Sequence, residues 1–247
     1  MFIDPLITYY LLLIPPPMFL HFINSTYGQA GKSWFIRAIV EIFARTDDRI
    51  IVVDASIDKR IGMTYSPAFN RAYDLQFSSQ DACAIDKLLD FGADNTIIVK
   101  LPASDLHHLI RWGRDTDIQT LGFPCYYWFV STGRDDYPLP VLDLFGHDNC
   151  FLVENHDRAR NFRAFGQPEF DPERVVRLPC ITTDPVEIYR IEHSQKPLAA
   201  LMETADLPIL TRSRIYRFLQ HTAESLEPIA IRNFDRDRKC RDAKHIA

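Results

Sequence analysis

The sequence lacks a long hydrophobic segment, an excess of positive charge and closely spaced cysteines, and each absence excludes a class of protein. The apolar run at residues 6–14 is shorter than the roughly 20 residues that cross a bilayer, and three prolines follow it. No basic segment precedes this run and no small-residue cleavage site follows it, so a secretory signal is not indicated. We therefore expect a cytoplasmic protein with no transmembrane span.

The net charge and the cysteine spacing exclude further classes of protein. The net charge is −5, with 28 basic and 33 acidic side chains, which argues against a broad nucleic-acid-binding surface but not against a local basic patch. The five cysteines are scattered, and no pair has the spacing of metal ligands. We therefore expect buried free thiols in a reducing compartment.

Residues 19–45 carry the strongest functional pattern. An apolar run at 19–23 predicts a buried strand, and apolar residues at helical spacing predict a helix that reaches residue 43. The turn between them ends in Gly31-Lys32-Ser33, which is the setting of a phosphate-binding loop. Loop amides and the N-terminus of the following helix favour a bound phosphate there.

The residues expected to hold a nucleotide come from this loop and from the start of the helix. They are Gly28, Gln29, Ala30, Gly31, Lys32, Ser33 and Trp34. Lys32 would contact the β and γ phosphates, and the Ser33 hydroxyl would ligate Mg²⁺. The competing interpretation is a chance Gly-Lys-Ser at a helix start, because Thr26 stands in place of the first glycine of the usual motif.

A second continuous apolar run, residues 49–53, predicts a strand buried on both faces of a parallel sheet, and it ends at Asp54. Strand, loop, helix and strand in this order form a βαβ unit. Asp54 would then emerge beside the phosphate loop at the carboxyl edge of the sheet, where a carboxylate holds Mg²⁺ through water. Lys32 and Asp54 are accordingly the candidate catalytic residues. The plainer alternative for Asp54 is a solvated aspartate at a strand end.

The rest of the chain alternates predicted strands and helices and shows no internal repeat. Further strands are expected at residues 95–99, 125–130, 150–153 and 175–178. Further helices are expected at residues 81–91, 105–112, 135–145, 185–191 and 211–226. Residues 56–80 show little periodicity and are interpreted as a long connection. The predicted fold class is therefore α/β, in three layers, with a mostly parallel central sheet flanked by helices.

The chain divides into one domain and two terminal segments. Residues 1–17 are expected to lie outside the fold, upstream of a natural start at Met18. Residues 18–232 form the predicted nucleotide-binding domain. Residues 233–247 are charged and poor in apolar side chains, so we expect a disordered tail.

Over residues 18–226 the chain resembles the ParA/MinD-like family of P-loop NTPases, and within it the plasmid stability and mobilisation proteins of the StbB or MobD kind. Four segments carry the resemblance: Tyr27-Gly-Gln-Ala-Gly-Lys-Ser33, Ile50-Ile-Val-Val-Asp54, Ile97-Ile-Val-Lys-Leu-Pro-Ala103 and Phe151-Leu-Val-Glu-Asn155. The first is similar to the family's deviant Walker A motif. The others are similar to the ends of three strands that border the nucleotide.

The resemblance implies an ATP-binding switch that uses Mg²⁺ and serves plasmid partition, stability or conjugative mobilisation. It also implies that Asn155 contacts the adenine. The implied partners are a second copy of the chain, plasmid partition or conjugation proteins, and DNA held without sequence preference. The basic residues expected to contact DNA are Arg158, Arg160, Arg163, Arg212, Arg214 and Arg217. An ordinary solvated face is the alternative for these arginines.

Three positions depart from the family pattern. Tyr27 replaces a lysine that reaches phosphates across a dimer, Ser56 replaces an aspartate that orients the attacking water, and Lys100 replaces the Walker B aspartate. A lysine cannot ligate Mg²⁺, although it could contact a phosphate directly. Hydrolysis is therefore expected to be slow or absent. Two alternatives stay open: a degenerate interaction scaffold that no longer uses nucleotide, and a P-loop kinase or ligase for a small molecule.

Overall fold

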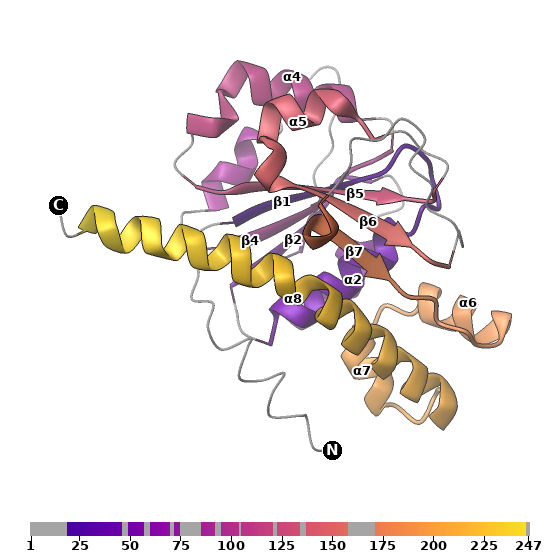
Figure 1. The fold of residues 1–247 in the computed structure, drawn as a ribbon. Coiled ribbons are helices and arrows are strands. Elements are labelled where there is room, and N and C mark those ends of the chain that lie inside the picture. Colours follow the sequence, from indigo (N-terminus) through magenta and orange to yellow (C-terminus); the bar gives the residue numbers. More distant parts are fainter. Residues whose placement is uncertain are drawn as a thin grey trace.

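The computed structural model describes residues 19–45, 49–56, 60–69, 72–74, 85–91, 95–103, 105–120, 123–133, 137–157 and 171–245. Within these residues, seven strands form one sheet in the order β3-β2-β4-β1-β5-β6-β7, and every neighbouring pair is parallel (Figure 1). The strands are β1 (Phe19–Asn24), β2 (Ile50–Asp54), β3 (Ala72–Asp74), β4 (Thr96–Lys100), β5 (Cys125–Ser131), β6 (Cys150–Asn155) and β7 (Val175–Leu178).

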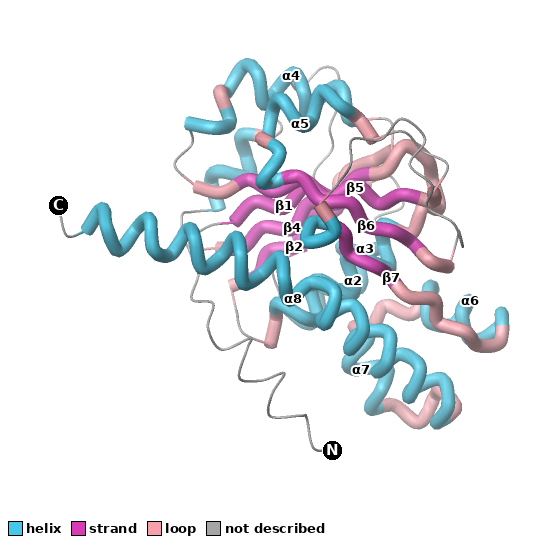
Figure 2. The backbone as a smooth tube through the Cα atoms, in the orientation of Figure 1, coloured by secondary structure: helices cyan, strands magenta, loops and turns pink. Residues whose placement is uncertain are grey.

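Helices cover both faces of this sheet (Figure 2). One face carries α2 (Lys32–Phe43), α3 (Arg60–Phe69), α7 (Leu198–Glu203) and α8 (Ile209–His245). The other face carries the 3-10 helix η1 (Asp86–Phe91), α4 (Leu106–Thr116) and α5 (Leu139–Phe145). The chain between β7 and α7 forms α6 (Pro185–His193), and short 3-10 turns lie at Ile118–Thr120, His147–Asn149 and Pro172–Arg174. Most strands are buried on both faces, which is why they are continuous apolar runs in the sequence.

The central strand β1 lies between β4 and β5. Its connection to β2 runs through α2 on one face, whereas the connection from β5 to β6 runs through α5 on the opposite face. Adjacent parallel strands whose connections part in this way leave a crevice at their carboxyl ends, and ligands bind there. The residues that follow β1 therefore lie at the ligand-binding edge of the fold.

The predicted α/β class with a parallel central sheet and flanking helices is confirmed, and all predicted strands are present. The prediction of an irregular connection over residues 56–80 is wrong, because α3 and β3 lie there. Gly62 and Pro67 inside α3 conceal its helical spacing. The start of α3 is stabilised from outside the helix, because the Asp54 carboxylate accepts hydrogen bonds from the backbone N–H groups of Ile61 and Gly62.

The carboxyl-terminal layer is larger than the sequence predicts. It includes α7, which has no predicted counterpart, and α8 continues to His245. The backbone of residues 233–245 is therefore helical where the sequence predicts a disordered tail. Among the residues whose burial is described, α8 contributes Leu226 and Ile229 to the core, and the sequence that follows is rich in charged residues.

Some expectations fall outside the described residues. They are those for residues 1–17 and a start at Met18, and for the first part of the predicted helix at 81–91. Of the described cysteines, Cys125 and Cys150 are buried as expected and Cys180 is exposed. Burial raises the pKa of the Cys125 and Cys150 thiols to about 12, so both stay protonated. No helix in the described part of the chain is both long and apolar enough to cross a membrane.

Candidate phosphate-binding site

The loop between β1 and α2 takes a backbone path that only glycine accepts easily at its last position. Gly31 has a φ of 101° and directly precedes the first residue of α2. A Cβ atom at Gly31 would lie 2.2 Å from Nδ2 of Asn155, too close for any side chain. Gln29 also has a positive φ, of 61°. The loop is thus held in a tight turn that brings the end of β6 against it.

Lys32 is buried within this loop, with 8% of its surface exposed. Its Nζ donates to Ser25 Oγ at 2.6 Å and to the Tyr27 carbonyl at 3.5 Å, and the Ser25 hydroxyl donates to the same carbonyl at 2.7 Å. The ammonium is therefore folded back onto neutral oxygen atoms of its own loop. Phosphate oxygens form stronger, charge-assisted hydrogen bonds with an ammonium, so a phosphate would displace these contacts readily.

Asn155 braces the loop from the end of β6. Its Nδ2 donates to the Ala30 carbonyl at 2.8 Å, and its Oδ1 accepts from the backbone N–H of Asp157 at 3.0 Å. Asn155 therefore lies directly against the loop. The predicted contact of Asn155 with an adenine stays a prediction.

The side chain of Trp34 faces the carboxyl-terminal layer rather than the loop. Its ring packs edge-on against Phe218 of α8, with ring centroids 5.8 Å apart, and its Nε1 donates to Glu192 of α6 at 3.0 Å. A contact between Trp34 and phosphate is therefore left to its backbone amide. The side chain itself fastens α2 to α6 and α8.

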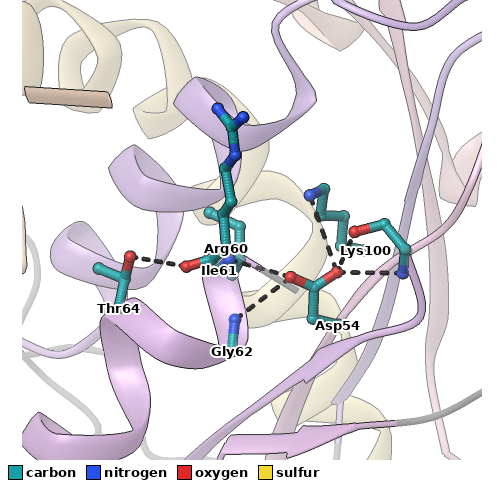
Figure 3. Close-up of polar contacts among 7 residues, drawn as sticks. Asp54, Arg60, Ile61, Gly62, Thr64 and Lys100 are labelled. Carbon is teal, nitrogen blue, oxygen red and sulfur yellow. Dashed lines mark hydrogen bonds and ion pairs between the residues drawn. The ribbon is translucent and has the colours of Figure 1, made fainter. Parts of the chain in front are cut away.

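Asp54 and Lys100 form a buried ion pair where β2 and β4 end, with Nζ 3.7 Å from Oδ1 (Figure 3). The same carboxylate accepts from the backbone N–H and the hydroxyl of Ser56 through Oδ1. Through Oδ2 it accepts from the first turn of α3, from Ile61 at 2.9 Å and Gly62 at 3.2 Å. Asp54 therefore joins three elements: β2, β4 and α3. Loss of one partner from a buried pair of this kind typically costs about 3–5 kcal/mol of stability.

These surroundings do not fit the predicted Mg²⁺ site. The described residues contain no group of three or more His, Cys, Asp or Glu side chains that could hold a metal ion. The Asp54 carboxylate already has an ammonium and several N–H or O–H donors as partners. At a separation of about 4 Å and an effective dielectric constant of about 20, a divalent ion and the Lys100 ammonium would repel by roughly 8 kcal/mol, which offsets the attraction of Asp54. The partners of Asp54 therefore argue against a metal role for this carboxylate, and a metal role for Ser33 stays a prediction.

A second buried charged group lies further along α2 and has no counterpart in the sequence-based predictions. Arg37 donates to the Ile191 carbonyl at 2.8 Å and to the Lys196 carbonyl at 2.9 Å. Glu41 accepts from the first two backbone N–H groups of α7, at 2.6 and 3.3 Å. Burial lowers the pKa of Arg37 and raises the pKa of Glu41, and the α7 hydrogen bonds oppose the second shift. Both residues connect α2 with the segment that contains α6 and α7.

The arginines expected to contact DNA are only partly described. Arg158, Arg160 and Arg163 lie outside the described residues. On α8, Arg212 donates to the Met202 carbonyl at 3.4 Å and Arg214 donates to Thr183 Oγ1 at 3.2 Å, while Arg217 is exposed. DNA contact stays a prediction, and two of the α8 arginines have intramolecular partners.

Comparison with known proteins adds no relative to this picture. No protein-family model matches the chain, and no curated protein matches its sequence. Function is therefore inferred from the parallel α/β fold and from the residues at its carboxyl edge.

Proposed function

We propose that this protein is an ATP-binding, ParA/MinD-like P-loop protein that acts as a nucleotide-dependent switch in plasmid partition, stability or conjugative mobilisation. The observation that carries the proposal is Lys32, a buried ammonium in a glycine-containing loop between β1 and α2. Burying a charge costs free energy, and Lys32 donates to neutral oxygen atoms of the loop, which carry no opposite charge. A phosphate in the loop would pair with this ammonium and would also accept hydrogen bonds from the amides at the start of α2.

Hydrolysis in this proposal is slow or absent. Phosphoryl transfer needs a positioned water and charge stabilisation of the phosphate oxygens. Ser56 donates its hydroxyl to Asp54 and offers no carboxylate to orient a water, and Lys100 stands where a metal-binding carboxylate is expected. The bound nucleotide would therefore act by its presence rather than by its turnover.

The partners in this proposal are a second copy of the chain, plasmid partition or conjugation proteins and DNA, in the cytoplasm. Tyr27 lies in the loop and is 57% exposed, so its ring is accessible to a partner. It lies where the resemblance implies a contact across a dimer. Nucleotide that orders the loop would change this surface, which supports a switch in association.

Titration of a fluorescent ATP analogue into the wild type and the Lys32→Ala variant tests the proposal. We expect saturable binding by the wild type and at least about tenfold weaker binding by the variant. The matched control is Lys196→Ala, which removes an exposed lysine whose partner is Asp206, at 3.2 Å. Circular dichroism verifies that all three proteins are folded. Absence of binding by a folded wild type at high analogue concentration would overturn the proposal.

The second candidate function is an interaction scaffold that no longer uses nucleotide. The observation that favours it is the Asp54–Lys100 pair, which fills part of the predicted metal site with protein groups. In that case the wild type, Lys32→Ala and Lys196→Ala would all fail to bind the analogue while remaining folded. Retention of a buried Lys32 argues for the first candidate, because a scaffold gains nothing from that charge.

A further inference from the structure

Lys100 is a buried lysine that lies outside the phosphate loop, at the end of a neighbouring strand. It is 3% exposed, at the last residue of β4, with its ammonium 3.7 Å from Asp54 Oδ1. A buried ion pair adds little net stability, because the loss of hydration offsets the attraction between the charges. An apolar pair in place of Asp54 and Lys100 would serve the sheet at least as well, so the retained charges need a functional explanation.

The strand register places Lys100 beside the loop. It is the partner of Ile23 on β1 and of Asp54 on β2. Partner residues on neighbouring strands point to the same face of a sheet, and Ile23 belongs to the core beneath α2. The Lys100 side chain therefore rises on the face where α2 begins with Lys32. Two lysines thus lie at the ligand-binding edge, one from the loop and one from β4.

We propose that Lys100 supplies the positive charge that Mg²⁺ would otherwise supply, so that the site binds the triphosphate of a nucleotide without a divalent metal. This inference rests on the proposed function. Lys32 faces the phosphate chain from the loop, and Lys100 faces it from β4. Asp54 acts as a positioning residue: it holds the Lys100 ammonium and accepts from the first turn of α3 (Figure 3). It also accepts from the backbone N–H of Ser56.

The arrangement also explains why one carboxylate is retained while the metal-binding set is incomplete. Asp54 accepts hydrogen bonds through both oxygens from protein groups, which leaves it oriented toward Lys100 rather than toward a hydrated cation. An ammonium contacts phosphate as a compact charge with three donors and needs no coordination geometry. A site built in this way responds to nucleotide concentration and is insensitive to the concentration of free Mg²⁺.

The experiment measures the affinity of the fluorescent ATP analogue in excess MgCl₂ and in excess EDTA. For the wild type we expect the two dissociation constants to agree within about twofold. For Lys100→Met we expect binding in EDTA to be at least about tenfold weaker than that of the wild type. Lys196→Met is the matched control, since it removes the same charge from an exposed position and is expected to bind like the wild type.

Each outcome is decisive. No binding by the wild type in either buffer overturns the proposed function, and this inference with it. Binding in MgCl₂ but not in EDTA leaves the proposed function standing and overturns the inference. Binding in both buffers that Lys100→Met retains shows that another group supplies the charge, which also overturns the assignment to Lys100. If Lys100→Met fails to fold, Lys100→Arg replaces it, because arginine keeps the positive charge. Loss of metal-independent binding by a folded Lys100→Arg contradicts the inference. If this variant is also unfolded, the comparison of the wild type in MgCl₂ and in EDTA decides.

Discussion

Two buried charged groups contact the same face of the sheet, and their partners differ in kind. In the middle of α2, Arg37 donates to backbone carbonyls of the α6–α7 segment, and Glu41 accepts from backbone N–H groups of the same segment. At the carboxyl edge, Lys32 donates to a hydroxyl and a loop carbonyl, and Lys100 pairs with a carboxylate. The first group connects α2 with the segment that contains α6 and α7, and so stabilises the packing of this segment on the sheet. The second keeps positive charge at an edge where the fold leaves a crevice.

This contrast distinguishes charged residues that stabilise the fold from charged residues that are available to bind a ligand. Removing Arg37 or Glu41 should change stability and leave ligand affinity unchanged in the protein that remains folded. Removing Lys32 should mainly lower ligand affinity, because its hydrogen bonds to Ser25 and to the Tyr27 carbonyl lie within the phosphate loop. The following changes test that division, and the first has the largest expected effect.

Arg37→Leu is expected to destabilise the protein by about 3–5 kcal/mol, because it leaves Glu41 buried without its compensating charge. Urea unfolding followed by circular dichroism measures the change. The exposed pair Arg111 and Asp115 supplies the control, and Arg111→Leu should cost less than about 0.5 kcal/mol. A loss of similar size for both variants would contradict the structural role of Arg37.

The second prediction concerns His21, a buried group on β1 that lies on the α2 face without belonging to either charged group. Its Nδ1 accepts from Trp128 Nε1 at 3.0 Å, and burial lowers its pKa from 6.5 to about 3. The unfolded chain therefore binds a proton that the folded protein excludes. The contribution of His21 to stability is complete above pH 6.5 and is lost at about 1.4 kcal/mol per pH unit as the pH falls from 6.5 toward 3.

Urea unfolding at pH 7.5, 6.5, 5.5 and 5.0, values that span about the first half of this window, measures the slope. The comparison is His21→Asn, whose side-chain oxygen can still accept from Trp128 but does not titrate. We expect the stability of the wild type to fall more steeply with acid than that of the variant, by about 2 kcal/mol between pH 6.5 and 5. Equal slopes would show that the pKa of His21 is not lowered in the folded protein.

The smallest expected effect concerns the contact between Gly31 and Asn155, which joins the loop to the end of β6. Gly31→Ala places a methyl group where the Asn155 amide lies and forces alanine into a left-handed backbone conformation. Asn155→Ala removes the clash but not the backbone strain. A double-mutant cycle should therefore show a coupling of about 1 kcal/mol between the two positions. Additive effects on stability would place Asn155 away from the loop.

Much of this fold follows from local sequence. The strands are apolar runs bounded by polar residues, and the phosphate loop is a contiguous motif whose glycine has the backbone angle that the turn needs. Both are written in neighbouring residues, so a pattern of a few positions is enough to predict them. The same reasoning succeeds for α6, where Asp184 accepts from the backbone N–H of Val186 as an N-terminal cap.

The parts that could not be predicted depend on residues far apart in the sequence. α3 begins where Asp54 accepts from its first turn, and α7 begins where Glu41 accepts from its first two N–H groups. The Asp54–Lys100 pair exists because the strand order places β4 next to β2 rather than next to its neighbours in the sequence. The outward turn of Trp34 likewise depends on Phe218 and Glu192. Local periodicity contains none of this information.

The central position of β1 has a consequence for how the chain folds during synthesis. β1 is the first strand of the sheet to be made, yet its two edges pair only with β4 and β5, which follow after residues 96 and 125. Both edges of this buried strand therefore stay unpaired until β4 is made, and one edge stays unpaired until β5 follows. Long-range parallel pairing of this kind folds slowly and leaves strand edges open to aggregation. We expect chains truncated before Cys125 to be recognised by chaperones and not to form any stable part of the sheet around β1.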